Sequence, residues 1–467
     1  MHLDTSTDPQ VGYRPSGRLD DAAAALQRYR GPFGHRHAGH LARRAGFGAT
    51  AAEIEALTRR GVDGAVDAYL HPTETEPDFA PYPDPALLYD PKKRYGAAKL
   101  WWLDRMLKTK RPLAEKMTLF WHGHFATSIA KVPPQLMVQQ IDLFRTHALG
   151  NFRLLLTAVS QDPAMLIWLD NRFNVAAHPN ENYAREVMEL FALGLGNYSE
   201  DDVKAAARAF TGWTLDKDAR FQYKEQAHDA GVKTFLGHTG PLTGEDVLAI
   251  IVEQPVHQRY ICRKLLEFFV YSDPEPELVD ALASVYALSG YDLAKTVGTI
   301  LRSNVFFSLR AYRALPKSPV EFAIGSLRYL GIADVPPDTP GWLARMGQDI
   351  MQPPNVKGWD GGPLWISTTT LLARFNYINK LVVSNSLALT PDALVAQAGG
   401  MNSGPVLETI VAGALQDDVT SDVRATLRDF LDSKSAEVPV PLGPENYQAK
   451  IRGALALVLN LPSNMLA

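Results

Sequence analysis

The sequence predicts an all-α fold, predominantly helical, with a small β-hairpin and long Pro/Gly-rich loops. Apolar residues recur at helical spacing nearly everywhere from about residue 20 onward. Helix starts are marked by capping patterns, as in Thr50-Ala51-Ala52-Glu53 and Ser199-Glu200-Asp201-Asp202. Strand-like alternation is scarce and no βαβ rhythm occurs, so a doubly wound sheet is not expected.

These signals place the elements in order along the chain. Asp162-Pro163 suits an N-cap followed by proline, and Gly194 suits the end of a helix. Residues 213–215 and 220–223 are expected to pair as a hairpin across Asp216-Lys217-Asp218. The predicted helices cover residues 20–30, 36–46, 50–60, 95–122, 134–148, 151–160, 180–194, 199–211, 244–252, 256–271, 275–289, 292–303, 318–330, 366–382, 404–414, 420–433 and 444–459.

Pro/Gly-rich stretches divide this helical pattern. They fall at residues 72–92, 226–243, 334–341 and 352–363, and the first holds six prolines. The expected organisation is a flexible leader (1–19), an N-terminal helical lobe with its Pro-rich loop (20–92), a main helical body (93–385) and a C-terminal helical segment (386–467).

Composition limits the class of protein. The chain has 467 residues, of which 46% are hydrophobic and 21% charged, which is typical of a globular protein with a sizeable core. A net charge of -4 argues against a nucleic-acid partner, which would require a basic surface. The single cysteine, Cys262, excludes an intramolecular disulfide and a thiolate zinc cluster, and its apolar neighbours predict a core position.

Neither a secretory signal nor a membrane span is recognised in the sequence. Residues 1–14 are polar, and no stretch approaches the roughly eighteen apolar residues that cross a bilayer. We therefore expect a cytoplasmic protein, with export as the alternative if a signal had been removed before residue 1. The sequence does not determine the oligomeric state.

The segment 178–194 is the strongest candidate for a functional site. On a helix, Asn182, Arg185, Glu186 and Glu189 fall within about 100° of one another, and we call them the polar stripe. Two interpretations compete. The stripe is either a site with paired carboxylates and a guanidinium, or a solvated face on which Arg185 forms i,i+4 ion pairs with Glu181 and Glu189.

Histidines form two further clusters. His122 and His124 would point about 200° apart on a helix. If Gly123 ends the helix, however, a turn can bring both rings together as metal ligands. Otherwise one is a core histidine and the other is exposed. His35, His37 and His40 have no carboxylate beside them, so a packing or surface role is expected.

Two loops carry the remaining candidates. His228-Asp229 lies in a Gly-rich loop, where an imidazole can serve as acid, base or ligand, or the pair can simply form a turn. The Pro353-to-Trp365 loop contains Trp359 and Trp365, which either pave a binding cleft or fix the loop to the core. Phosphate-binding loops, nucleophile elbows, zinc helices and dinucleotide fingerprints are absent, so no nucleotide or dinucleotide cofactor is expected.

The sequence contains a series of motifs in this order: His40-Leu41, Arg44 through Phe47-Gly48, Phe120-Trp121-His122-Gly123-His124-Phe125, Asn180 through Glu186, Glu189-Leu190-Phe191, Ala207 through Trp213, His228-Asp229, Lys233-Thr234, Leu236-Gly237 and Pro353 through Trp365. With these motifs, the sequence resembles the bacterial domain-of-unknown-function 1800 family. The resemblance spans roughly residues 35–380, and members of this family often carry an export signal, which residues 1–14 lack. The family name records no activity, so the resemblance implies the fold and the motif positions but no chemistry.

The leading hypothesis is an enzyme, a hydrolase or lyase acting on a polar polymer such as a glycan. Glu186 and Glu189 would supply acid/base or electrostatic catalysis, since glycosidic chemistry uses paired carboxylates. Arg185 would bind an anion, His228 or His124 would move a proton, and Asp229 or Asp360 would be the alternative second carboxylate. Substrate contacts are expected from Asn182, Arg208, Trp213, Trp359 and Trp365.

Two alternatives stay open. The first is a metal-dependent enzyme, in which a divalent metal is bound by His122, His124, His228 and Glu186 or Glu189. The second is a non-catalytic binding or assembly protein, in which the polar stripe is a partner surface or a buried ion network. In every case the ligand is expected to be a small molecule or a polymer.

Overall fold

The computed structural model describes residues 22–79, 91–432 and 442–467, and it is mainly helical. The predicted all-α class is confirmed, with helices α1–α22 and two small antiparallel hairpins in the described residues. The expected leader (1–19) and most of the 72–92 loop lie outside them. The proposed division into lobes remains a prediction.

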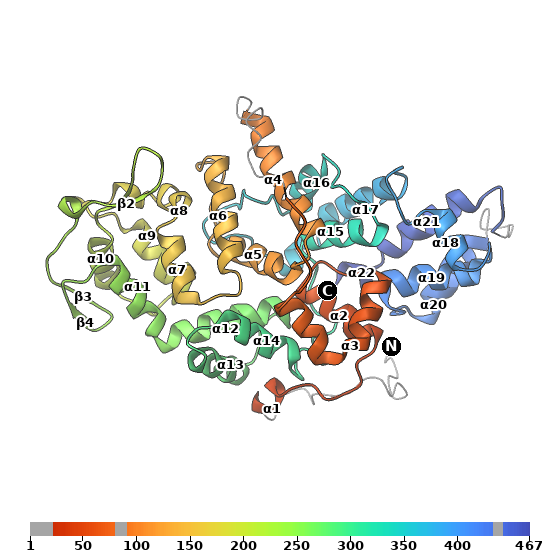
Figure 1. Ribbon diagram of the computed structural model, residues 1–467, viewed down its shortest axis with the longest axis horizontal. Helices are drawn as coiled ribbons and strands as arrows, with labels where there is room; N and C mark the ends of the chain where they lie inside the picture. Colours follow the sequence, from red (N-terminus) through yellow and green to blue (C-terminus); the bar gives the residue numbers. More distant parts are fainter. Residues whose placement is uncertain (1–21, 80–90, 433–441) are drawn as a thin grey trace.

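Short helices and both hairpins form one end of the elongated molecule (Figure 1). Strand β1 pairs with β2 so that Thr214 faces Gln222, which confirms the predicted hairpin. The elements are α7 (Phe152–Ser160), α8 (Pro163–Trp168), α9 (Glu181–Glu186), a π-helix (Val187–Ala192), α10 (Glu200–Ala209), β1 (Trp213–Leu215), β2 (Phe221–Tyr223), β3 (Lys233–Phe235), β4 (His238–Gly240) and α11 (Gly244–Glu253), with 3-10 turns at η2 (Asn171–Phe173) and η4 (Glu225–Ala227).

The middle of the molecule brings together helices that are distant in sequence (Figure 1). Helix α2 packs on α3 and α5, and α15 packs on α4. These helices are α1 (Ala22–Leu26), α2 (His35–Ala45), α3 (Ala51–Leu70), α4 (Pro91–Lys108), α5 (Pro112–His124), α6 (Pro134–His147), α12 (Pro255–Phe269), α13 (Pro276–Leu288), α14 (Leu293–Arg302), α15 (Pro319–Leu330), α16 (Thr339–Arg345) and α22 (Pro462–Met465).

The C-terminal helices form the opposite end (Figure 1). Helix α21 contacts α17, α18, α19 and α20, so the end is built around it. The elements are η5 (Gly362–Trp365), α17 (Thr368–Val382), α18 (Pro391–Gln397), α19 (Ser403–Leu415), α20 (Ser421–Asp432) and α21 (Tyr447–Leu459).

Capping residues explain where many helices begin. The side chains of Thr50, Ser199 and Thr243 each accept a hydrogen bond from the amide three residues later, as their sequence patterns predict. Asp162 caps α8 in the same way. Cys262 is fully buried, which confirms its predicted core position.

Several predicted boundaries were wrong. Residues 95–122 form two helices because Pro112, which lacks an amide hydrogen, starts a new one. The expected loop 226–243 contains a second hairpin, β3–β4, and α16 begins inside the expected loop 334–341. No helix among the described residues has the length and apolarity that a membrane crossing requires.

Candidate functional site

The polar stripe lies on α9 and the following π-helix, and Arg185 forms ion pairs there. Its guanidinium donates to both oxygens of Glu200, at 2.7 and 2.8 Å, and to Glu181 at 3.2 Å. These bonds raise the pKa of Arg185 above its ordinary value. The Arg185–Glu181 contact is the i,i+4 pair expected of a solvated helix face, so Arg185 is already occupied by carboxylates.

The two stripe glutamates are half-buried and lie close to each other. Glu189 accepts a hydrogen bond from the Tyr198 hydroxyl at 2.7 Å. Burial raises the pKa of Glu186, and the negative charge of Glu189 raises it further. Asn182 is exposed and lies in the first turn, where its amide donates to the N-cap residue Asn180.

Arg208 and Asp229 form a bidentate ion pair that closes the 228–232 loop onto α10. The two bonds measure 2.6 and 3.1 Å, and they lower the pKa of Asp229 to about 2. The amide of Asp229 donates to Thr211, and Nδ1 of His228 lies 3.0 Å from the Thr211 carbonyl oxygen. The loop is thus held by its own residues.

Trp213 belongs to the core. It is 1% exposed and packs edge-on against Phe210 and Phe221, which fixes the hairpin to the helical body. The sequence predicted a substrate contact here, but the indole has almost no surface to offer a ligand.

His122 binds a loop that is more than 200 residues away in the sequence. Its Nε2 accepts a hydrogen bond from the amide of Met351 at 3.0 Å, and its ring lies 5.5 Å from that of Trp359. Met351 has a φ of +60°, which is strained for a residue with a side chain. The buried imidazole therefore stabilises an unusual turn just before the Trp359 loop.

His124 binds the end of the π-helix instead of sharing a ligand with His122. Its Nε2 donates to the Phe191 carbonyl at 2.8 Å, while Tyr260 donates to Leu190 and His257 lies within hydrogen-bond distance of Ala192. Three consecutive carbonyls at the end of this helix thus have side-chain partners. They connect the segment that carries the polar stripe to α5 and α12.

A cleft of about 430 Å³ opens beside His124, and we call it the central cleft. It lies where α2, α5, α12, α15 and the 353–365 loop meet. Its lining includes Arg44, Phe120, Gly123, His124, Lys264, Glu267, Phe268, Ser318, Glu321, Gln348, Lys357, Trp359, Asp360 and Trp365. Three of the sequence-predicted site residues, His124, Trp359 and Trp365, line it together with the alternative carboxylate Asp360.

Glycine 358 lets the tryptophan loop approach α5. Its φ is +88°, and an added Cβ would lie 2.2 Å from the carbonyl oxygen of Gly123. Only glycine fits this contact without displacing the backbone. Trp359 follows directly, and Trp365 ends the short 3-10 turn after Gly361, so the loop presents two half-buried indoles to the cleft.

The cleft contains acid/base groups with shifted pKa values. Burial raises the pKa of Glu267, although the charge of Lys264 opposes that rise. Burial lowers the pKa of Lys264, and it lowers the pKa of His124 well below the ordinary range. Nδ1 of His124 is buried and makes no hydrogen bond within the described residues, so the neutral ring keeps one acceptor nitrogen unused.

The predicted metal ligands are not gathered in one place. In residues 22–79, 91–432 and 442–467, no group of three or more His, Cys, Asp or Glu is arranged to hold a metal ion. The accepting nitrogen of His122 is occupied by Met351, and His228 lies in the 228–232 loop between the two hairpins, near Thr211.

Residues 40–466 match the family described as "Protein of unknown function (DUF1800)". The chain belongs to the DUF1800 family. No curated protein and no solved structure was found to match it. In this DUF1800 chain, the central cleft is bordered by three of the segments that carried the resemblance, around Arg44, around His124 and from Pro353 to Trp365.

Sequence reasoning missed the α12 contribution to the cleft. Lys264 and Glu267 stand three residues apart on a helix, where they read as an ordinary surface pair. No local signal separates them from other such pairs. Their half-buried position opposite Trp359 follows only from the packing of α12 against the loop.

Proposed function

We propose that the central cleft binds a polar polymer such as a glycan and that the protein acts on it as a hydrolase or lyase. One observation carries this proposal. Trp359 and Trp365 border the same cavity as Lys264, Glu267 and His124. Indole faces suit the apolar faces of sugar rings, and a carboxyl, an ammonium and an imidazole group suit proton transfer.

In this proposal Glu267 is the general acid, because it lines the cleft and burial raises its pKa. Asp360 or Glu321, which also line the cleft, supplies the second carboxylate for hydrolysis. For elimination, Lys264 with its lowered pKa is the base. Glu186, Glu189, Arg185, His228 and Asp229 lie outside the cleft lining, and their catalytic role stays a prediction.

The test uses soluble chito-oligosaccharides, cello-oligosaccharides and polygalacturonate as probes. Binding is measured by calorimetry, and cleavage by new reducing ends or by absorbance of unsaturated products. We expect one probe class to bind, and Trp359→Ala to weaken it about tenfold. Trp342→Ala, which removes a half-buried tryptophan on α16, is the matched control and should bind normally.

Glu267→Gln separates an enzyme from a binding protein. An enzyme should lose about 100-fold or more in rate while the Kd stays near that of the unaltered protein. Binding without any turnover in the unaltered protein would support a non-catalytic binding protein. If none of the probes binds, the glycan assignment fails. A metal-dependent reaction has less support, because the described residues gather no ligand set.

A further inference from the structure

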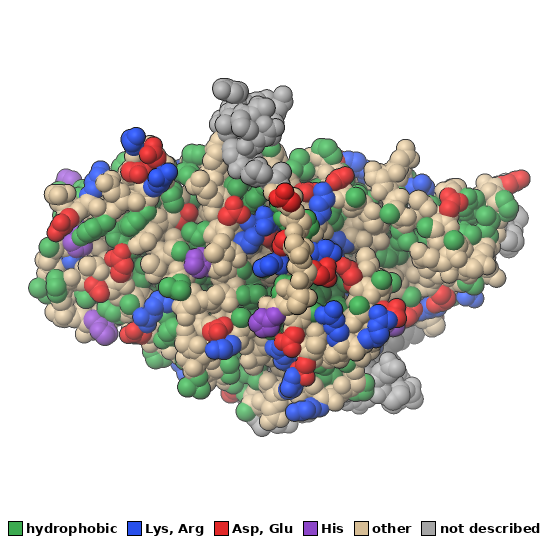
Figure 2. Space-filling view, viewed as in Figure 1, with side chains coloured by type: hydrophobic (Ala, Val, Ile, Leu, Met, Phe, Trp, Pro, Cys, Tyr) green, Lys and Arg blue, Asp and Glu red, His purple; other side chains and the backbone are tan. Residues whose placement is uncertain are grey.

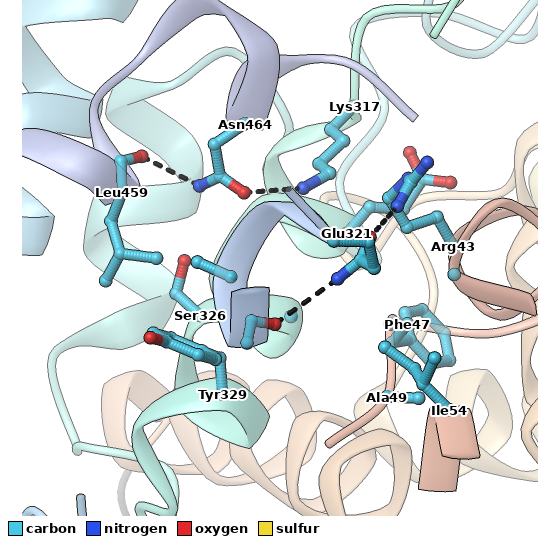
Figure 3. Close-up of a pocket in the computed structure, with 16 residues that line it drawn as sticks. Arg43, Phe47, Ala49, Ile54, Lys317, Glu321, Ser326, Tyr329, Leu459 and Asn464 are labelled. Carbon is cyan, nitrogen blue, oxygen red and sulfur yellow. Dashed lines mark hydrogen bonds between the residues drawn. The ribbon is translucent and has the colours of Figure 1, made fainter. Parts of the chain in front are cut away.

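A second, smaller cavity adjoins the central cleft at Glu321, and we call it the basic cavity (Figure 3). It has a volume of about 50 Å³ and shares Glu321 with the cleft. This is room for a few water molecules or one small polyatomic ion. Its walls come from α2, α15 and the C-terminal helices, and they include Arg43, Phe47, Ile54, Lys317, Ser326, Tyr329, Gln416, Leu459 and Asn464.

Positive charge is in excess around this cavity. Glu321 forms an ion pair with Lys116, and the charges of Arg44, Lys317 and Arg374 also act on it. Arg43 adds a fifth cation, because its charge acts on Lys317, and Asp418 is the carboxylate that acts on Arg43. Arg43, Arg44, Lys116 and Arg374 are each at most 8% exposed. Buried charges are normally paired, so this excess is costly without an anion.

The neighbouring acidic residue does not remove the excess. Asp418 accepts hydrogen bonds from Arg36 and Arg313, at 2.9 and 2.5 Å, and is therefore occupied by two other cations. On the face shown in Figure 2, by contrast, Lys and Arg are interspersed with Asp and Glu. The excess of positive over negative side chains is therefore found in the interior around the basic cavity.

Hydrogen-bond donors at the cavity lack acceptors. Nε and Nη2 of Arg43 are buried and have no acceptor at hydrogen-bond geometry within the described residues, and its remaining terminal nitrogen donates to Gln416. Tyr312, whose ring lies 5.6 Å from the guanidinium carbon, opposes the lowering of the Arg43 pKa by burial. Lys317 donates to Asn464 at 3.0 Å, which leaves two ammonium hydrogens without a described acceptor (Figure 3). A guanidinium edge and an ammonium therefore both border the cavity.

The neutral polar groups in the wall are already satisfied. Ser326 donates to Phe322, Tyr329 donates to Ile410, and Asn464 donates to Leu459. The donors that await a partner are thus cationic, which selects an anion with several acceptor oxygens over a neutral ligand.

We propose that the basic cavity binds a small inorganic oxyanion, phosphate or sulfate, held directly by Arg43 and Lys317. Arg44, Lys116 and Arg374 supply the surrounding positive field. This site is separate from the proposed glycan site, although Glu321 borders both cavities. The bound anion would hold α2, α15 and the C-terminal helices together.

The test begins with protein dialysed into HEPES buffer with neither phosphate nor sulfate. Equilibrium dialysis with radiolabelled phosphate should show about one site per chain, with sulfate competing. Arg43→Met and Lys317→Gln should each weaken binding about tenfold or more. Lys204→Met, which removes an exposed lysine, is the matched control and should bind like the unaltered protein.

Thermal unfolding gives an independent measure of phosphate binding, because it records the Tm of each protein with and without phosphate. Phosphate should raise the Tm of the unaltered protein saturably, and it should not raise that of Lys317→Gln. Without the anion, Lys317→Gln should unfold at the same or a higher temperature, because one uncompensated charge is gone. Trp359→Ala should keep the phosphate response, which separates this proposal from the glycan proposal.

Three results would overturn the assignment. The first is the absence of saturable phosphate and sulfate binding in the unaltered protein. The second is an equal Tm response to sodium chloride at matched ionic strength, which would show screening or chloride binding. The third is competition by glucose 6-phosphate as strong as that by phosphate, which would show an open site for a larger ester.

Discussion

The polar stripe and the central cleft both contain acidic and basic side chains, but their partners differ. Arg185 at the stripe, and Arg208 beside it, are bound to carboxylates within hydrogen-bond distance. Burial shifts the pKa values of Lys264 and Glu267 toward their neutral forms, as it does for Glu186 in the stripe, but only Lys264 and Glu267 line the central cleft. Arginines that are paired with carboxylates stabilise the fold. Ionisable groups that line a cavity and whose charged form is disfavoured by burial are available to a ligand.

A core tryptophan near the stripe end of the molecule and a cleft tryptophan give the largest expected difference in stability. Trp213→Ala should lower the free energy of unfolding by about 3–5 kcal/mol, because it leaves a void in the core. Trp359→Ala should cost about 1–2 kcal/mol, since this indole is only half-buried. Urea unfolding followed by circular dichroism measures both values. Equal losses would contradict the contrast between a core and a cleft tryptophan.

Two glycines of the same loop sharpen the picture of the cleft wall. Gly358→Ala should destabilise the protein by about 2 kcal/mol or more, because it adds a clash with Gly123 to the strain of a positive φ. Gly362→Ala, with a φ of +56° and no atom near its Cβ position, should cost about 1 kcal/mol. The same unfolding experiment compares them, with Trp359 fluorescence as a local probe. A smaller loss at Gly358 would place the loop elsewhere.

Asp229 in the 228–232 loop and Glu267 in the central cleft should respond to pH with opposite sign. Its hydrogen bond to Arg208 lowers the pKa of Asp229 to about 2, so Asp229 stabilises the fold above pH of about 4 and loses this effect as the pH falls toward 2. Burial raises the pKa of Glu267, so its favourable contribution exists below about pH 4 and is lost as the pH rises through the folded-state pKa.

Asp229→Asn should therefore lower stability at pH 7 by less than about 1 kcal/mol after solvent screening, and Glu267→Gln should leave it unchanged or raise it. Chemical unfolding between pH 3 and pH 7 checks both variants. If Glu267→Gln destabilised the protein at pH 7 more than Asp229→Asn did, Glu267 and not Asp229 would be the carboxylate whose charge stabilises the fold.

Arg185→Met is expected to have the smallest effect. Its partners Glu181 and Glu200 are largely exposed, and water screens such pairs, so the Tm should change by no more than about 1 °C. Calorimetry at low and high salt measures this. A loss of cleavage of a bound probe without a change in Tm would instead support the catalytic role that the sequence suggests for the stripe.

The sequence by itself determined the helical class, many helix starts and the β1–β2 hairpin. These depend on local chemistry, since caps such as Ser199 and turns such as residues 216–219 bond within a few residues. One of the two interpretations of the stripe paired Arg185 with Glu181 and Glu189; the structure forms the Glu181 pair, while Glu189 accepts a hydrogen bond from Tyr198 and Arg185 binds Glu200 instead.

Only the tertiary structure decided which groups share a cavity. Arg44, His124, Lys264 and Trp359 are separated by tens to hundreds of residues, and their convergence depends on how α2, α5 and α12 pack. Packing also buried Trp213 and brought the Met351 amide within hydrogen-bond distance of His122. The physical reason is that burial and long-range contacts determine the solvation and pKa of a side chain. The local spacing of residues along the chain does not specify either burial or long-range contacts.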